Sequence, residues 1–130
     1  MAGLDVPCSL YIHIPFCAGA CDYCDFYSIP VSAGDPRLDR YVDALLADGE
    51  YTLAAHGLKQ VPTLYLGGGT PSLLGPERIR RLLAGLGSLL PEPPGEITVE
   101  ANPESADGPF LAAARDGGVT RLSLGVQTFH

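Results

Sequence analysis

The sequence predicts an α/β fold in which four parallel strands are joined by three crossover helices. Short apolar runs typical of strands alternate with segments whose apolar residues recur at helical spacing. Gly and Pro gather between these segments, as expected for loops. Two neighbouring strands joined through a helix have to run parallel. The alternation therefore predicts one parallel sheet, either open or forming part of a barrel.

The first strand is predicted at 9–15, where the apolar residues include Leu10, Ile12 and Ile14. A loop that carries cysteines follows and ends near Gly34. Asp35 and Pro36 then begin a helix, because Asp caps a helix amino terminus and Pro suits the first turn. This helix has apolar residues at helical spacing and is expected to stop at Gly57, which can adopt the left-handed conformation of a helix end. Its apolar positions are Leu38, Tyr41, Val42 and Leu45.

The remaining elements continue the same alternation. They are a strand at 63–66, a helix that begins at Pro76, a strand at 96–100, a short helix at 109–116 and a strand at 121–129. No helix follows the last strand, and four strands of a barrel would leave an inner face and an edge bare. We therefore expect residues 1–130 to be an incomplete domain, the N-terminal piece of a longer protein. A complete small flavodoxin-like domain is the alternative.

Composition excludes several classes of function. Eight basic and fifteen acidic residues give a net charge of −7, which argues against a surface for nucleic acid or for anionic lipid. The sequence has no apolar run long enough to span a membrane, and residues 1–10 do not resemble a secretion signal. We expect a cytoplasmic protein. In that reducing compartment, clustered cysteines favour metal or redox chemistry over disulfides.

Three of the four cysteines form a C-x3-C-x2-C pattern at Cys17, Cys21 and Cys24. Three thiolates on one loop can hold a [4Fe–4S] cluster and leave one iron open to an exogenous ligand. Structural zinc prefers four protein ligands, and Cys8 is separated from the loop by a whole predicted strand. An iron–sulfur cluster is therefore the favoured interpretation, with a zinc site and inert or disulfide-bonded thiols as alternatives. Cys8 is expected to take no part.

The segment Tyr11–Cys17, which reads YIHIPFC, and the three cysteines together resemble the radical S-adenosylmethionine (SAM) superfamily. Within it, the chain is similar to the oxygen-independent coproporphyrinogen III oxidase family. Three further blocks agree with this resemblance in order along the chain. They are YLGGGTPS at 65–72, TVEANPES at 98–105 and RLSLGVQTF at 121–129.

This resemblance implies the N-terminal part of a partial (β/α)6 barrel, with the cluster and SAM at the carboxyl ends of the strands. Function also gathers at these ends in parallel α/β folds in general. The resemblance implies Cys17, Cys21 and Cys24 as cluster ligands. It implies SAM contacts at Tyr11, Gly68, Gly69, Thr70, Glu100 and Gln127. Of these, Gln127 matches a position that meets a second SAM in the oxidases.

Each implied SAM contact has a structural alternative. The glycines could form an ordinary strand-to-helix turn, and Glu100 could be a solvated acid at a strand end. Tyr11 could be a core residue and Gln127 a structural amide. His13 is expected to be structural, because strand alternation places it opposite Ile12 and Ile14.

Two features distinguish branches of the family. The oxidases carry a further cysteine two places after the third ligand, where this chain has Phe26, and only ten residues precede Tyr11. Both features resemble the HemW-type heme chaperone branch, which implies that the full-length protein binds heme and passes it to an acceptor protein. The alternative is an oxidase that converts two porphyrinogen propionates to vinyl groups with SAM. A zinc-stabilised module without SAM is a third hypothesis, and peripheral membrane association stays open.

Overall fold

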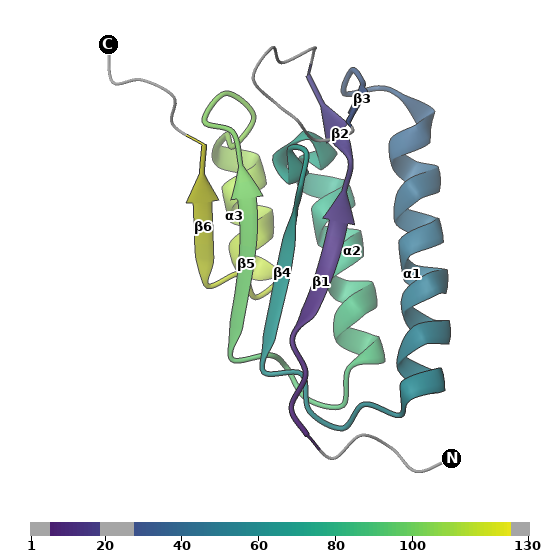
Figure 1. The fold of residues 1–130 in the computed structure, drawn as a ribbon. Helices are drawn as coiled ribbons and strands as arrows, with labels where there is room; N and C mark the ends of the chain where they lie inside the picture. Colours follow the sequence, from purple (N-terminus) through teal and green to yellow (C-terminus); the bar gives the residue numbers. More distant parts are fainter. Residues whose placement is uncertain (1–5, 19–27, 126–130) are drawn as a thin grey trace.

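A computed structural model of the chain describes residues 6–18 and 28–125. Four parallel strands form one sheet in the order β1-β4-β5-β6, and three helices lie behind it on one face (Figure 1). The strands are β1 (Leu10–Ile14), β4 (Thr63–Gly68), β5 (Glu96–Ala101) and β6 (Arg121–Leu124). The helices are α1 (Pro36–His56), α2 (Gly75–Leu89) and α3 (Gly108–Asp116). The predicted α/β class, the alternation of strands and helices along the chain, and the parallel strand direction are confirmed.

Local signals define the helix ends. The Asp35 carboxylate accepts a hydrogen bond from the Arg37 backbone N–H at 2.9 Å and caps α1. Gly57 ends α1 with φ of 57°, a left-handed conformation that glycine adopts without a steric penalty. Asp107 caps α3 by accepting from the Phe110 N–H at 3.0 Å. None of the described helices is both long and apolar enough to cross a membrane.

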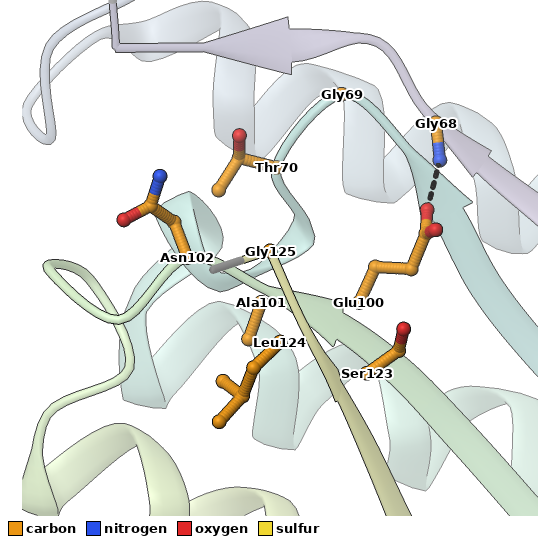
Figure 2. Close-up of a pocket in the computed structure, with 9 residues that line it drawn as sticks. All are labelled: Gly68, Gly69, Thr70, Glu100, Ala101, Asn102, Ser123, Leu124 and Gly125. Carbon is orange, nitrogen blue, oxygen red and sulfur yellow. Dashed lines mark hydrogen bonds between the residues drawn. The ribbon is translucent and has the colours of Figure 1, made fainter. Parts of the chain in front are cut away.

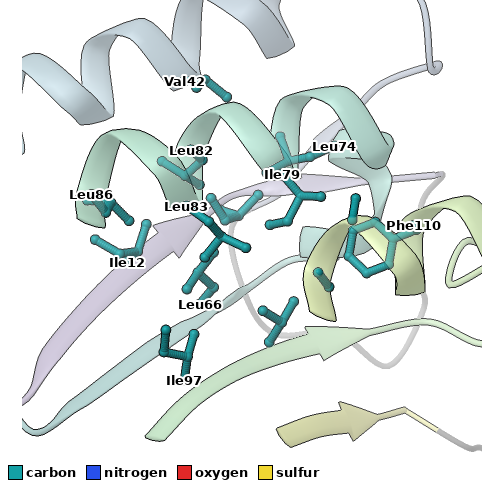
Figure 3. Close-up of a cluster of buried hydrophobic side chains, with 14 of the residues drawn as sticks. Ile12, Val42, Leu66, Leu74, Ile79, Leu82, Leu83, Leu86, Ile97 and Phe110 are labelled. Carbon is teal, nitrogen blue, oxygen red and sulfur yellow. The ribbon is translucent and has the colours of Figure 1, made fainter. Parts of the chain in front are cut away.

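The hydrophobic core lies between the sheet and the helices (Figure 3). Alternate residues of the strands, such as Ile14 and Leu66, are fully buried there. The apolar face of α2 covers the middle of the sheet, and Phe110 of α3 is also fully buried. The fully buried core side chains, at 0% exposure, are Ile14, Leu38, Val42, Leu66, Ile79, Leu82, Val99, Phe110 and Ala113.

Several element boundaries differ from the prediction. The first strand is shorter than 9–15, and a 3-10 helix, η1 (Pro71–Leu74), comes before α2. A two-stranded parallel sheet of β2 (Phe16–Cys17) and β3 (Ile29–Pro30) brackets the cysteine loop and was not predicted. It was missed because two-residue strands have no recognisable periodicity. The fourth strand begins at Arg121 as predicted, and residues 126–130 lie outside the described part.

The second face of the sheet is not covered by any described helix. Strand alternation places Tyr11 and His13 of β1 on this face, together with Tyr65 of β4 and Glu100 of β5. The exposed face expected from the sequence is therefore present among the described residues. It is polar and aromatic rather than aliphatic, which lowers the cost of its exposure to water.

Candidate functional site

The carboxyl ends of β4, β5 and β6 meet at one edge of the sheet, where a cavity of about 220 Å³ is found (Figure 2). This arrangement follows from the parallel strand direction, which places all carboxyl ends at the same edge. The cavity is lined by Gly68, Gly69, Thr70, Glu100, Ala101, Asn102, Ser123, Leu124 and Gly125. Four of the six SAM contacts that the resemblance implied are therefore brought together, although Glu100 lies about thirty residues beyond the consecutive residues Gly68, Gly69 and Thr70.

Glu100 is held at both carboxylate oxygens. Its Oε1 accepts a hydrogen bond from the Gly68 backbone N–H at 2.8 Å, and its Oε2 accepts one from the Tyr65 hydroxyl at 3.0 Å. Figure 2 shows the first of these bonds at the side of the cavity. The half-buried side chain is therefore not a simple solvated acid. Each oxygen keeps acceptor capacity, because a carboxylate can accept about four hydrogen bonds.

The glycine-rich loop after β4 is hydrogen-bonded to the segment that leads into the cysteine loop. The Gly69 N–H donates to the Ile14 carbonyl at 2.6 Å, and the Thr70 N–H donates to the Phe16 carbonyl at 2.6 Å. A side chain at Gly69 would collide with the Phe16 carbonyl, so this approach needs glycine. The N–H groups of residues 68–70 all donate hydrogen bonds within the protein. The acceptors that the loop offers to a ligand are its backbone carbonyls and the Thr70 hydroxyl.

Tyr11 lies on the uncovered face of the sheet and not in the lining of the cavity. Its side chain is 54% exposed, so it takes no part in the core between the sheet and the helices. The ring stacks on Tyr65 with a centroid distance of 6.0 Å, and its hydroxyl lies 3.0 Å from Nδ1 of His13. Partial burial and the negative charge of Glu100 raise the pKa of Tyr11 above its ordinary value. Tyr11 is thus linked to the cavity through Tyr65 and Glu100.

Cys17 lies beside a second cavity of about 380 Å³ that adjoins the first. The two cavities share Thr70 and Asn102 as lining residues. The Cys17 sulfur accepts a hydrogen bond from the Ser28 hydroxyl at 3.2 Å, across the mouth of the cysteine loop. Residues 6–18 and 28–125 contain no group of three metal-binding side chains, because the other two predicted ligands lie outside them. Cys21, Cys24 and Gln127 all fall outside the described residues.

The sequence analysis did not single out Asn102 and Ser123, which line the cavity, or Tyr65, which donates a hydrogen bond to Glu100. Asn102 follows β5 directly, and its side chain oxygen accepts from the Glu104 N–H at 2.9 Å. Its position in an Asn-Pro pair at a strand end was a usable signal. Ser123 is paired with Glu100 in the sheet register. The contact of Tyr65 with Glu100 likewise depends on how neighbouring strands lie side by side. No spacing in the sequence reveals either of them.

The described residues fit SAM, a ligand with an ammonium and a sulfonium cation. Glu100 supplies a negative charge at the cavity, and the backbone of the adjoining loop presents carbonyl acceptors, because its N–H groups at residues 68–70 donate within the protein. A cavity whose charged groups are all of one sign attracts a ligand of the opposite charge. Cys17, one of the predicted cluster ligands, lines the neighbouring cavity, where a cluster in contact with SAM would have to lie.

A parallel α/β sheet with a cysteine loop and a glycine-rich, acidic cavity at its carboxyl edge is the arrangement that the resemblance to radical SAM proteins implied. The model of the radical SAM superfamily matches residues 11–130, and the chain belongs to this superfamily.

Two curated relatives and one solved structure are similar to this chain over most of its length. The chain is 44% identical over 94% of its length to the heme chaperone HemW of Mycobacterium tuberculosis (strain CDC 1551 / Oshkosh) and 43% identical over 95% to HemW of Escherichia coli K12. It covers 32% of each of these proteins, so it spans about a third of their length. The solved structure of coproporphyrinogen III oxidase (HemN) from Escherichia coli, a radical SAM enzyme, matches with a TM-score of 0.81 and 34% identity. That match covers 95% of this chain and 29% of the oxidase.

Proposed function

We propose that the whole protein is a cytoplasmic heme chaperone of the HemW type, which binds heme and passes it to an acceptor protein. The observation that carries this proposal is similarity: relatives named as heme chaperones are up to 44% identical, whereas the structurally known oxidase is 34% identical. Phe26 supports the same branch, because it stands where the oxidases carry a cysteine. Residues 1–130 would then be the N-terminal part of the radical SAM core, with the heme site elsewhere in the protein.

In this proposal, Cys17, Cys21 and Cys24 hold a [4Fe–4S] cluster, and SAM occupies the cavity beside Glu100. When bound, the cluster is a one-electron donor for the SAM sulfonium. The carboxylate of Glu100 and the hydroxyl of Thr70 accept hydrogen bonds from the ligand. Gly69 lets the loop lie close to Phe16, and thereby keeps the cavity next to the cysteine loop.

The deciding experiment compares heme binding with porphyrinogen turnover in the full-length protein. Anaerobically prepared protein would be titrated with heme, and in parallel incubated with SAM, an electron donor and coproporphyrinogen III. We expect saturable heme binding without vinyl products. A Cys17→Ala variant is the control for turnover, because vinyl products that persist in it do not depend on the cluster.

Methionine and vinyl products in stoichiometric amounts, with no heme binding, would instead assign the protein to the oxidases. Iron and sulfide analysis of the same preparation tests the cluster itself. A preparation that contains zinc in place of iron and sulfide would contradict both the chaperone and the oxidase.

A further inference from the structure

We propose that Tyr65 is a positioning residue that orients the Glu100 carboxylate toward a ligand in the cavity. This inference rests on the proposed SAM site and adds a residue that the motif comparison did not assign. Tyr65 is outside the set of residues that line the cavity, whereas Glu100 is inside it. The Tyr65 hydroxyl donates to Glu100, and this hydrogen bond connects it to the cavity.

Two donors define the orientation of the carboxylate. The Tyr65 hydroxyl donates to Oε2 at 3.0 Å and the Gly68 N–H donates to Oε1 at 2.8 Å. Without the hydroxyl, the Gly68 N–H would be the one donor left among the described residues, and the carboxylate could rotate about its last side-chain torsion. This torsion has a broad energy profile in glutamate, so a single hydrogen bond restrains it poorly.

The position of the Tyr65 ring is itself restrained. Its ring stacks on Tyr11 with an interplanar angle of 20°. On its other side the ring and the carboxylate share the space above Gly67, where a Cβ atom would lie 2.7 Å from Cε1 of Tyr65 and would also collide with Oε1 of Glu100. The phenol is thus held in place by packing before any ligand binds, which is the requirement for a positioning group.

The electrostatic surroundings agree with this geometry. Partial burial and the hydrogen bond to the negatively charged Glu100 raise the pKa of Tyr65 above its ordinary value. The phenol therefore stays protonated at neutral pH and remains a donor. A hydrogen bond from a neutral hydroxyl to a carboxylate is among the stronger side-chain hydrogen bonds.

The test is a double-mutant cycle on SAM affinity. Full-length protein with its cluster reconstituted anaerobically would be titrated with SAM by calorimetry as wild type, Tyr65→Phe, Glu100→Ala and the double variant. We expect Tyr65→Phe to weaken binding by roughly tenfold, the effect of one hydrogen bond to a charged group. In the Glu100→Ala background, the same substitution should have almost no further effect, because its target is gone.

The matched control is Tyr51→Phe, which removes a phenol hydroxyl from a side chain that is 76% exposed on α1. It should leave SAM affinity unchanged, and its melting temperature should match that of Tyr65→Phe. If Glu100→Ala binds too weakly to be titrated, Glu100→Asp provides the second background, since its shorter side chain withdraws the carboxylate from the hydroxyl.

Three results would overturn the inference while leaving the SAM site intact. The first is an unchanged SAM affinity in Tyr65→Phe. The second is an equal loss of SAM affinity from this substitution in the wild-type and Glu100→Ala backgrounds. The third is a loss of SAM affinity that accompanies a general fall in the stability of the Tyr65→Phe protein. A wild-type protein that contains the cluster and does not bind SAM would instead contradict the proposed site, and the inference with it.

Discussion

The thiolates of the cysteine loop are the residues on which cluster binding should depend. Alanine at Cys17, Cys21 or Cys24 is expected to abolish the visible absorption band of the reconstituted cluster, because each thiolate would ligate one iron of the proposed cluster. Cys8→Ala is the matched control. The Cys8 backbone N–H donates to the Gln60 carbonyl near the amino end of β1, whereas the cavity lies at the carboxyl ends of the strands. A cluster retained in Cys17→Ala, or lost in Cys8→Ala, would refute the assignment of ligands.

Gly67 should be required for SAM binding, because the Glu100 carboxylate lies where a side chain at residue 67 would be. In Gly67→Ala, the methyl group displaces the carboxylate and the Tyr65 ring together. We expect SAM affinity, measured by calorimetry, to fall by roughly tenfold or more, since the site loses a hydrogen bond to a charged group.

Gly87→Ala is the control for that substitution, because a Cβ at Gly87 meets nothing within 4 Å. Gly87 lies inside α2, where replacing glycine with alanine stabilises a helix by about 0.5–1 kcal/mol. Its melting temperature should rise and its SAM affinity should not change. Equal affinities of the two variants would show that the space above Gly67 is not needed.

Among the helices, α1 should show a dependence of stability on pH that originates at its cap. Asp35 accepts hydrogen bonds from the Arg37 side chain and backbone, which lower its pKa to about 2 in the folded protein. Because the folded value lies below the unfolded value of 3.8, this contribution to stability is present above about pH 4 and is lost as the pH falls toward 2.

The substitution that isolates this effect is Asp35→Asn, since Asn also caps helices well but does not titrate. Chemical denaturation of the two proteins at several values of pH gives the comparison. The stability advantage of the wild type should shrink between about pH 4 and pH 2. A difference that stays constant over this interval would mean that the charge of Asp35 contributes nothing.

For the molecule as a whole, the edge at β6 is the surface most prone to association. Leu122 and Leu124 are 40% and 50% exposed, and β6 pairs only with β5 in the described part of the chain. Exposed edges with apolar side chains promote pairing between molecules. We expect the 130-residue chain to self-associate with increasing concentration, and Leu122→Lys with Leu124→Lys to reduce this in sedimentation experiments.

The control for the edge is the pair Val6→Lys and Tyr51→Lys, at side chains that are 62% and 76% exposed away from β6. Both double variants raise the net charge by the same amount, so a difference between them reports on the edge and not on charge. Equal self-association in the two would contradict the role of β6.

Local patterns in the sequence were sufficient to predict the helices and their alternation with the strands of the main sheet. Asp35 and Gly57 mark the ends of α1, and the apolar spacing in α2 identifies its buried face. These signals are short-range, because capping and periodicity act within one or two turns. Gly68 and Glu100, two of the predicted site residues, lie at the carboxyl ends of β4 and β5 and line the cavity.

The contacts that shape the cavity depend on the three-dimensional structure. Tyr65 and Glu100 meet because β4 and β5 pair in one particular register, and Ser123 joins them because β6 pairs next to β5. A shift of one residue would send each of these side chains to the other face of the sheet. The sequence therefore determines which residue types are available at the strand ends, whereas lateral pairing decides which of them touch, since that pairing couples residues distant along the chain.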